Sequence, residues 1–154
     1  MDDIHLIKNI FTEEERKRII QNLQPLLTTL YNCPGRQTWP TIHLHETMSP
    51  FITRLLNLTQ EKLGLNLEIQ RAWAKWSNGK KDQMNWHKHD SDIASVYYLK
   101  TNSFLNSGTL FKDRGFVRAS PNDFIIFPGN FEHSTPSHPF GIERYVVSVN
   151  FMVK

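Results

Sequence analysis

From Leu65 to Lys154, short β-prone runs alternate with clusters of Gly, Pro, Asn, Asp and Ser, and no helical spacing of apolar residues recurs. Many short strands joined by turns pack as two facing sheets or as a closed barrel, which leaves few exposed sheet edges. The sequence therefore predicts a mostly β domain of the jelly-roll or double-stranded β-helix class (a cupin-like barrel). The expected strands lie at approximately 67–77, 83–89, 94–100, 107–112, 115–119, 123–127, 131–135 and 143–153.

The residues before Leu65 carry the signals of two helices, which makes the predicted fold α+β. The segment Thr12–Glu15 (TEEE) is a capping box, and its acidic residues lie where the helix dipole favours negative charge. Ser49 is followed by proline, which is favoured at the start of a helix, and Gly64 provides an end signal. A short strand is expected at 4–7.

Composition fits one soluble globular domain. The 154 residues suffice for a sizeable core, 39% of them are apolar, and the mean hydropathy is −0.46. No repeat or linker divides the chain. We therefore expect a single domain over 1–154, in which a helical brace at 1–64 supports a β-barrel core at 65–154.

Charge and cysteine content argue against several classes of protein. The 18 basic and 15 acidic residues leave a net charge of +3, a small and scattered excess that indicates solvated surface rather than a nucleic-acid interface. The single cysteine, Cys33, excludes an internal disulfide and suits a reducing compartment. No signal peptide and no apolar run long enough to span a bilayer is visible. We expect a cytoplasmic protein without a membrane partner.

Three histidines form a candidate metal site. His87 and His89 are two residues apart in a predicted strand, so their side chains point to the same face. His133 follows another predicted strand that ends at a Pro-Gly turn. Each of them alone is also compatible with surface exposure or packing. Together they suggest a metal site, because neutral imidazoles are the commonest protein ligands of transition metals.

Arg144 is a candidate anchor for a carboxylate. It opens an apolar run, 144–151, in which alternation places Arg144, Val146 and Ser148 on one face. Both faces of the run are largely apolar, so the strand is expected to be central. A buried arginine is costly unless an anion pairs with it. That anion is a bound ligand or, as the alternative, a structural salt-bridge partner.

The order of these motifs resembles the 2-oxoglutarate and Fe(II)-dependent oxygenase superfamily, and most of all its prolyl 4-hydroxylase-like branch. The resemblance covers about 65–154. It is carried by the set of motifs in sequence order: H-x-H at 87–89, VYYL at 96–99, GTL at 108–110, FP at 127–128, His133 and RYVVS at 144–148.

The resemblance implies that His87 and His133 bind iron. The superfamily's usual motif is H-x-D, whereas this sequence has His89 at the third position. Strand geometry favours ligation by His89, because Asp90 would point to the opposite face. A bulge after His89 would instead bring in Asp90 or Asp92, so both aspartates stay open as alternative ligands.

The resemblance also implies a site for the cosubstrate. Arg144 would bind the distal carboxylate of 2-oxoglutarate, with Ser148 and Tyr98 beside that carboxylate and Trp76 lining the pocket. The expected cofactors are Fe(II), 2-oxoglutarate and O2, and the expected activity is that of a dioxygenase, a hydroxylase that releases succinate and CO2.

Two other functions compete with this one. Cupin metalloproteins use an H-x-H motif on a similar barrel, but the glutamate that usually follows it is missing here. A jelly-roll binding module without catalysis is the second alternative. A peptide or protein side chain, a nucleotide and a small metabolite all stay open as substrate. Lys80 and Lys81 lie in a turn where such folds often carry substrate loops.

Overall fold

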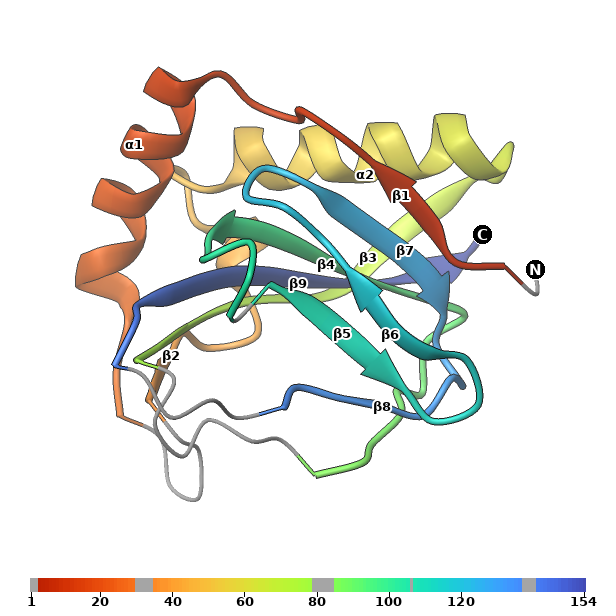
Figure 1. The fold of residues 1–154 in the computed structure, drawn as a ribbon. Coiled ribbons are helices and arrows are strands. Elements are labelled where there is room, and N and C mark those ends of the chain that lie inside the picture. Colours follow the sequence, from red (N-terminus) through yellow and green to blue (C-terminus); the bar gives the residue numbers. More distant parts are fainter. Residues whose placement is uncertain (1–2, 30–34, 79–84, 106, 137–140) are drawn as a thin grey trace.

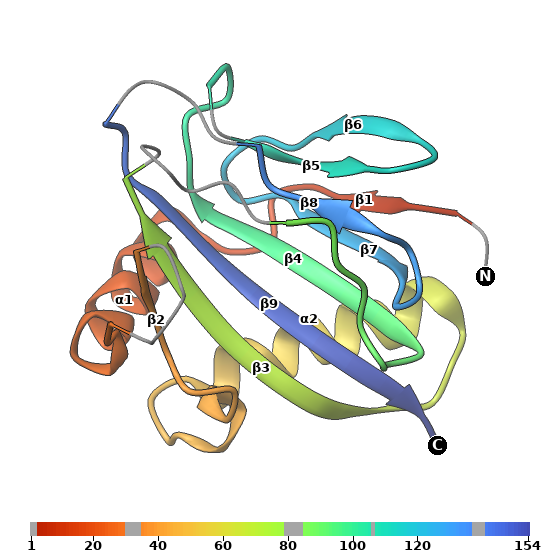
Figure 2. The same cartoon turned by 90° about the horizontal axis from the view of Figure 1, so that it is seen from below.

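The computed structural model describes residues 3–29, 35–78, 85–105, 107–136 and 141–154. They form two antiparallel sheets that face one another (Figures 1 and 2). The elements are β1 (His5–Ile7), α1 (Glu13–Leu23), β2 (Arg36–Gln37), α2 (Ser49–Leu63), β3 (Leu67–Ser77), β4 (Ile93–Lys100), β5 (Gly108–Phe111), β6 (Gly115–Arg118), β7 (Phe124–Pro128), β8 (His133–Ser134) and β9 (Arg144–Val153), with 3-10 turns at Gln24–Leu26 and Ile42–Leu44. The major sheet has the order β1-β7-β4-β9-β3-β2, and the minor sheet has the order β6-β5-β8.

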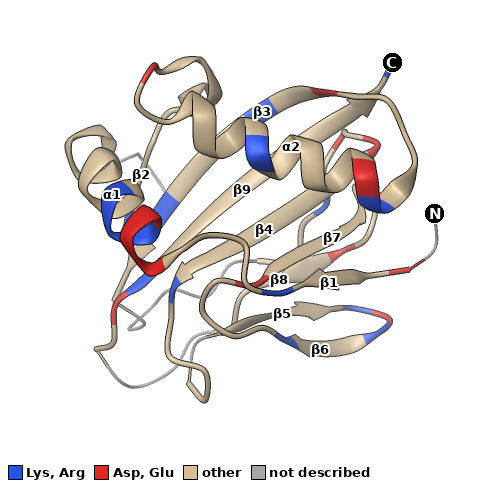
Figure 3. Cartoon of the chain, turned by 90° about the horizontal axis from the view of Figure 1, so that it is seen from above, with Lys and Arg blue, Asp and Glu red and all other residues tan. Residues whose placement is uncertain are grey.

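Both predicted helices are confirmed, and they cover one face of the major sheet (Figure 3). The Thr12 hydroxyl accepts a hydrogen bond from the Glu15 amide at 3.1 Å, and the Glu15 carboxylate accepts one from the Thr12 amide at 3.0 Å, which completes the capping box. Helix α2 ends at Gly64, whose φ of +66° is a left-handed conformation that suits glycine. Within the described residues, neither helix has the length and apolarity needed to cross a membrane.

Strand β9 lies between β3 and β4 in the middle of the major sheet, as its apolar sequence predicts. Its odd-numbered apolar residues from Tyr145 to Phe151 join the core beneath the helices. Val146 instead belongs to the smaller apolar cluster between the sheets, and Arg144 and Ser148 line a cavity on the same side. The predicted alternation is confirmed, and it directs the polar residues of β9 to the space between the sheets.

One predicted strand is wrong in the part that the structure describes. Residues 85–89 do not form a regular strand; a single antiparallel bridge joins His87 to His133. The amide of His87 donates to the His133 carbonyl at 3.1 Å, and the amide of His89 donates to the Gly129 carbonyl at 2.8 Å. The segment therefore follows the chain around 129–133 instead of extending a sheet.

The N-terminal part contributes more than helices. Strand β1, predicted at 4–7, pairs with β7 at one edge of the major sheet, and β2 pairs with β3 at the other edge. The predicted brace at 1–64 is thus also part of the sheet. Lys80, Lys81 and Cys33 lie outside the described residues.

Candidate metal centre

His87, His89 and His133 converge at one point between the two sheets. One ring nitrogen from each lies within 4.8 Å of the others, and among the described residues this is the group of side chains able to hold a metal ion. The ring centroids of His87 and His133 are 4.2 Å apart, and those of His89 and His133 are 5.1 Å apart. The structure thus brings all three predicted histidines together, while their ligation of a metal stays a prediction.

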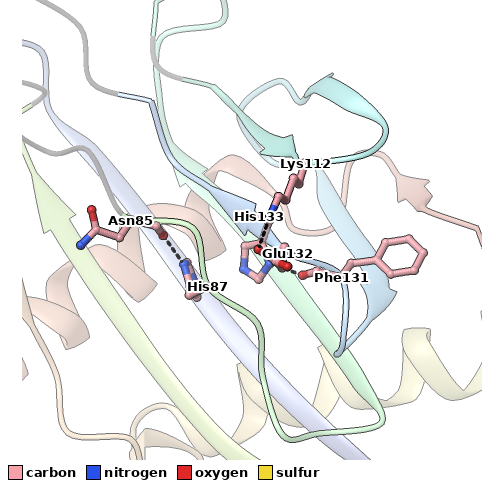
Figure 4. A network of polar contacts seen from close by, with 6 residues as sticks. All are labelled: Asn85, His87, Lys112, Phe131, Glu132 and His133. Carbon is pink, nitrogen blue, oxygen red and sulfur yellow. Dashed lines mark hydrogen bonds and ion pairs between the residues drawn. The ribbon is translucent and has the colours of Figure 1, made fainter.

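A hydrogen bond from Nδ1 to the backbone carbonyl two residues earlier orients two of the three rings. Nδ1 of His87 lies 2.8 Å from the carbonyl oxygen of Asn85, and Nδ1 of His133 lies 2.8 Å from that of Phe131 (Figure 4). A carbonyl oxygen can only accept, so each Nδ1 carries the proton and donates it. Each Nε2 then keeps its lone pair for a metal, and the hydrogen bond fixes the direction of the ring.

The segment that carries His133 is fastened to the minor sheet. The backbone amide of Lys112 donates to the carbonyl of Glu132 at 3.0 Å, and their side chains form an ion pair of 3.0 Å (Figure 4). This pair is half-exposed, so its contribution to stability is small. The register of the His133 segment with β5 comes from the backbone, in which Phe111 is paired with His133 and Leu110 with Ser134.

Burial keeps two of the imidazoles neutral. It lowers the pKa of His89 to about 4, and the neighbouring His87 lowers it further. Burial also lowers the pKa of His133 to about 4, although its hydrogen bond to Phe131 acts in the opposite direction. At neutral pH both rings are therefore unprotonated, which is the form that binds a metal.

Neither aspartate that follows the H-x-H motif lies with the histidines. The Asp90 carboxylate is largely exposed and lies 3.5 Å from the guanidinium of Arg71. The Asp92 carboxylate accepts a hydrogen bond of 2.8 Å from the amide of Val153, at the far end of β9. The geometry thus favours His89 as the third ligand over both alternatives.

The three histidines open into a cavity on the inner face of the major sheet. It is lined by residues of β2, β3, β4, β5, β8, β9 and the adjoining loops: Gln37, Trp73, Lys75, His87, His89, Ser95, Val96, Thr109, His133, Thr135, Arg144, Val146 and Ser148. Two predicted cosubstrate residues, Arg144 and Ser148, are therefore in the same cavity as the histidines.

The guanidinium of Arg144 lies over the ring of Tyr98. The arginine is only 4% exposed, and its guanidinium carbon lies 5.8 Å from the centroid of the Tyr98 ring. Tyr98 itself is fully buried, and its hydroxyl contacts the hydroxyl of Thr109, which lines the cavity. Burial raises the pKa of Tyr98 to about 12, so the phenol stays neutral. Tyr98 thus positions the arginine and does not itself line the cavity.

The pairing of the strands gives the order of the residues along this side of the cavity. Tyr98 and Lys75 are both paired with Val146, two residues beyond Arg144 on β9. Ser148 is paired with Trp73, whose ring centroid is 5.8 Å from that of His89. Along β9 the cavity therefore runs from Arg144 past Val146 to Ser148, whose partner Trp73 lies next to His89.

The prediction for Trp76 needs correction. Successive residues of β3 face opposite sides of the sheet, and Trp76 lies on the side of the helices. Its indole nitrogen donates to the Glu143 carboxylate at 3.4 Å, and Arg36 lies over its ring at 5.8 Å. It lines a separate groove with these residues and does not reach the cavity of the histidines.

Sequence reasoning missed the two residues of β3 that do line the cavity, Trp73 and Lys75. The signal that identifies them is the pairing of β3 with β9. Residues opposite Ser148 and Val146 must share their face of the sheet, and those residues are Trp73 and Lys75.

Searches with protein-family models and against curated protein sequences find no match to this chain. Solved structures do match, and they decide the fold. HygX from Streptomyces hygroscopicus, solved with nickel, 2-oxoglutarate and hygromycin B bound, superposes with a TM-score of 0.77 at 12% identity, over 97% of this chain and 82% of HygX. The chain has the double-stranded β-helix fold.

Two prolyl hydroxylases are similar in the same way. One is from Trichoplax adhaerens, in complex with a hypoxia inducible factor peptide fragment; its TM-score is 0.72 at 15% identity, over 97% of this chain and 83% of that one. The other is a prolyl-4-hydroxylase from Pseudomonas putida, with a TM-score of 0.73 at 14% identity, over 98% and 92%. At such identities the likeness establishes the fold, and the function has to be argued from the site.

Proposed function

We propose that this chain is a 2-oxoglutarate-dependent, non-haem iron oxygenase. His87, His89 and His133 would hold Fe(II), and Arg144 would bind the distal carboxylate of 2-oxoglutarate. One observation carries the proposal: a single cavity is lined by three convergent imidazoles and by a buried arginine. HygX, which shares the fold, binds nickel and 2-oxoglutarate in its solved structure.

The donor set fits iron. Imidazole nitrogens suit divalent metals such as iron, and three of them on one side of the ion leave other positions open. Nε2 of His87 and of His133 is available because Nδ1 of each ring is occupied by a backbone carbonyl. A guanidinium suits the other end of the ligand, since it can hold a carboxylate through two parallel hydrogen bonds.

In the proposed reaction the bound iron, 2-oxoglutarate and O2 supply the oxidation, which converts 2-oxoglutarate into succinate and CO2 and hydroxylates the substrate. The residues of the chain bind and orient. Arg144 would bind the distal carboxylate. The Tyr98 ring, over which the guanidinium lies, would keep that group in position. Val96 and Val146 line the cavity with apolar surface and limit the entry of water. Trp73 forms a wall beside His89.

We propose a peptide side chain or a small metabolite as the substrate. Structures of this fold were solved with a hypoxia inducible factor peptide fragment and with hygromycin B, so the architecture accommodates both kinds of ligand. The composition of the sequence fits a protein that acts in the cytoplasm.

The test of the function is anaerobic titration of the protein with Fe(II) and 2-oxoglutarate. We expect a weak visible charge-transfer band that requires both components, followed by succinate release when O2 is admitted. Glutarate is the matched control, because it lacks the keto oxygen that would chelate the iron. A cupin metalloprotein would bind iron without the 2-oxoglutarate-dependent band, and a binding module without catalysis would release no succinate. Either result would contradict the proposal.

Replacement of Ser148 by alanine should have a small effect on the cosubstrate. The hydroxyl lines the cavity and can donate one neutral hydrogen bond to a carboxylate. Such a bond contributes about 0.5–1.5 kcal/mol. The 2-oxoglutarate concentration for half-maximal succinate release should therefore rise by roughly two- to tenfold. Ser103→Ala, outside the cavity, is the control. An unchanged requirement in Ser148→Ala would remove Ser148 from the binding site.

A further inference from the structure

Gly129 lies where the two segments that carry the histidines touch. Its amide donates to the carbonyl of Asp92 at 3.0 Å, and its carbonyl accepts from the amide of His89 at 2.8 Å. Residues 89–92 therefore wrap around the backbone of Gly129, and this contact is the crossing of the two segments. The preceding residue ends β7 and is paired with the first residue of β4, so the crossing is anchored in the major sheet.

The crossing leaves no room for a side chain at position 129. A Cβ there would lie 2.8 Å from both the carbonyl carbon and the hydroxyl oxygen of Ser91, and closer still to its carbonyl oxygen. Non-bonded carbon atoms are in contact at about 3.5–4.0 Å, so these distances are clashes. Two of the three atoms belong to the backbone, and a change of rotamer cannot move them. Only a shift of residues 89–92 would make room.

His89 depends on this crossing more than the other two histidines do. The rings of His87 and His133 are each held by a hydrogen bond from Nδ1 to a carbonyl, and their backbones are bonded to each other in both directions. Among the described residues, the His89 ring has no such hydrogen bond. The position of its imidazole therefore follows from the position of its backbone, which is bonded to Gly129.

We propose that Gly129 is a positioning residue for His89. Because position 129 has no side chain, residues 89–92 close around it, and this closure brings the third imidazole to the other two. The inference rests on the proposed function in one respect, which is the metal that the three rings would hold. The placement of His89 itself concerns the protein without metal.

The first experiment is anaerobic competition for Fe(II) against a chelator, with the full chain carrying Gly129→Ala. The added methyl group should displace His89 and weaken Fe(II) binding at least tenfold, since residues that support metal ligands typically affect affinity by about 10–100-fold. Gly141→Ala is the matched control: Gly141 has no positive φ, and among the described residues its Cβ would meet no atom within 4 Å apart from its chain neighbours. Unchanged affinity in a folded Gly129→Ala variant would overturn the proposal.

The double variant Gly129→Ala/His89→Ala separates positioning from a general loss of structure. If Gly129 acts through His89, the double variant should bind Fe(II) within about threefold of His89→Ala alone, because the ligand is already gone. Independent effects would multiply, and the double variant would lose at least about another factor of ten. The EPR spectrum of the Cu(II)-loaded Gly129→Ala protein should show the nitrogen splitting of two imidazoles in place of three. Multiplied losses, or three imidazoles in the folded variant, would contradict the proposal.

Amide hydrogen exchange of the unchanged, metal-free protein tests the same crossing even if Gly129→Ala does not fold. The amides of His89 and Gly129 each donate one of the two hydrogen bonds of the crossing. A single opening should expose both, so their protection factors should agree within about threefold. If the His89 amide exchanges freely while the Gly129 amide is protected, the inference is wrong.

Failure of this inference can be told apart from failure of the proposed function. If the unchanged protein binds Fe(II) and releases succinate but Gly129→Ala keeps its affinity, the function stands and the role of Gly129 is wrong. If the two amides share their protection but Fe(II) is not bound or no succinate appears, the placement of His89 by Gly129 stands and the oxygenase assignment is wrong.

Discussion

Replacement of Arg144 by alanine is expected to raise the 2-oxoglutarate concentration needed for half-maximal succinate release at least tenfold. Arg144 is buried, its guanidinium lies over the Tyr98 ring, and it lines the same cavity as the three histidines. A hydrogen bond to a charged group contributes about 1.5–3 kcal/mol, and each 1.4 kcal/mol corresponds to a factor of ten. Because Arg144 is not in reach of the metal in this scheme, the iron content of the variant should be unchanged.

The controls for Arg144 separate loss of binding from loss of structure. Arg144→Lys keeps the charge but loses the planar fork, so it should fall between alanine and the unchanged protein. Arg118→Ala removes an exposed arginine of β6 that does not line the cavity, and it should leave the requirement unchanged. Thermal unfolding reports whether Arg144→Ala is folded. A folded variant with an unchanged 2-oxoglutarate requirement would exclude Arg144 as the anchor.

The parts of the fold that depend on local pattern could be predicted from the sequence. The capping box at Thr12, the glycine end signal at Gly64 and the alternation along β9 each act within a few residues, so they can be read without a partner strand. The alternation also placed Arg144 and Ser148 on one face, which the structure confirms.

The parts that failed depend on contacts between distant segments. The segment 85–89 is shaped by its bonds to Gly129 and His133, which are 40 and 46 residues from their partners His89 and His87, and no local signal specifies them. The sequence analysis placed Trp76 in the cavity. Trp76 instead faces the helices, whereas Trp73 and Lys75, on the opposite face of β3, line the cavity. From Ala72 to Ser77, β3 has no exposed residue on either side, so its sequence does not reveal which face meets the cavity until its pairing with β9 is known.

The second large effect concerns His89. Its replacement by alanine should weaken iron binding at least a hundredfold, about 2.7 kcal/mol, because even residues that only support metal ligands typically affect affinity by 10–100-fold. Asp90→Asn and Asp92→Asn should leave iron affinity within about twofold. The reason is geometric: Asp90 faces Arg71, and Asp92 is bound to the amide of Val153.

The measurement is anaerobic competition for Fe(II) against a chelator of known affinity, with each variant shown to be folded. His45→Ala is the matched control for the loss of a histidine, because His45 is exposed and its ring contacts Thr47 outside the cluster. If His89→Ala keeps its iron while either aspartate variant loses it, the three-histidine site is wrong.

The same titration has a second readout that depends on the charge of the ligand set. Three neutral imidazoles leave the full +2 charge of the iron for other groups to offset. Dianionic 2-oxoglutarate offsets this charge, so it should tighten iron binding, and iron should tighten 2-oxoglutarate binding by the same factor. A carboxylate ligand would already cancel one charge and weaken this coupling. An iron affinity that does not change with 2-oxoglutarate would therefore contradict a site made of His87, His89 and His133 alone.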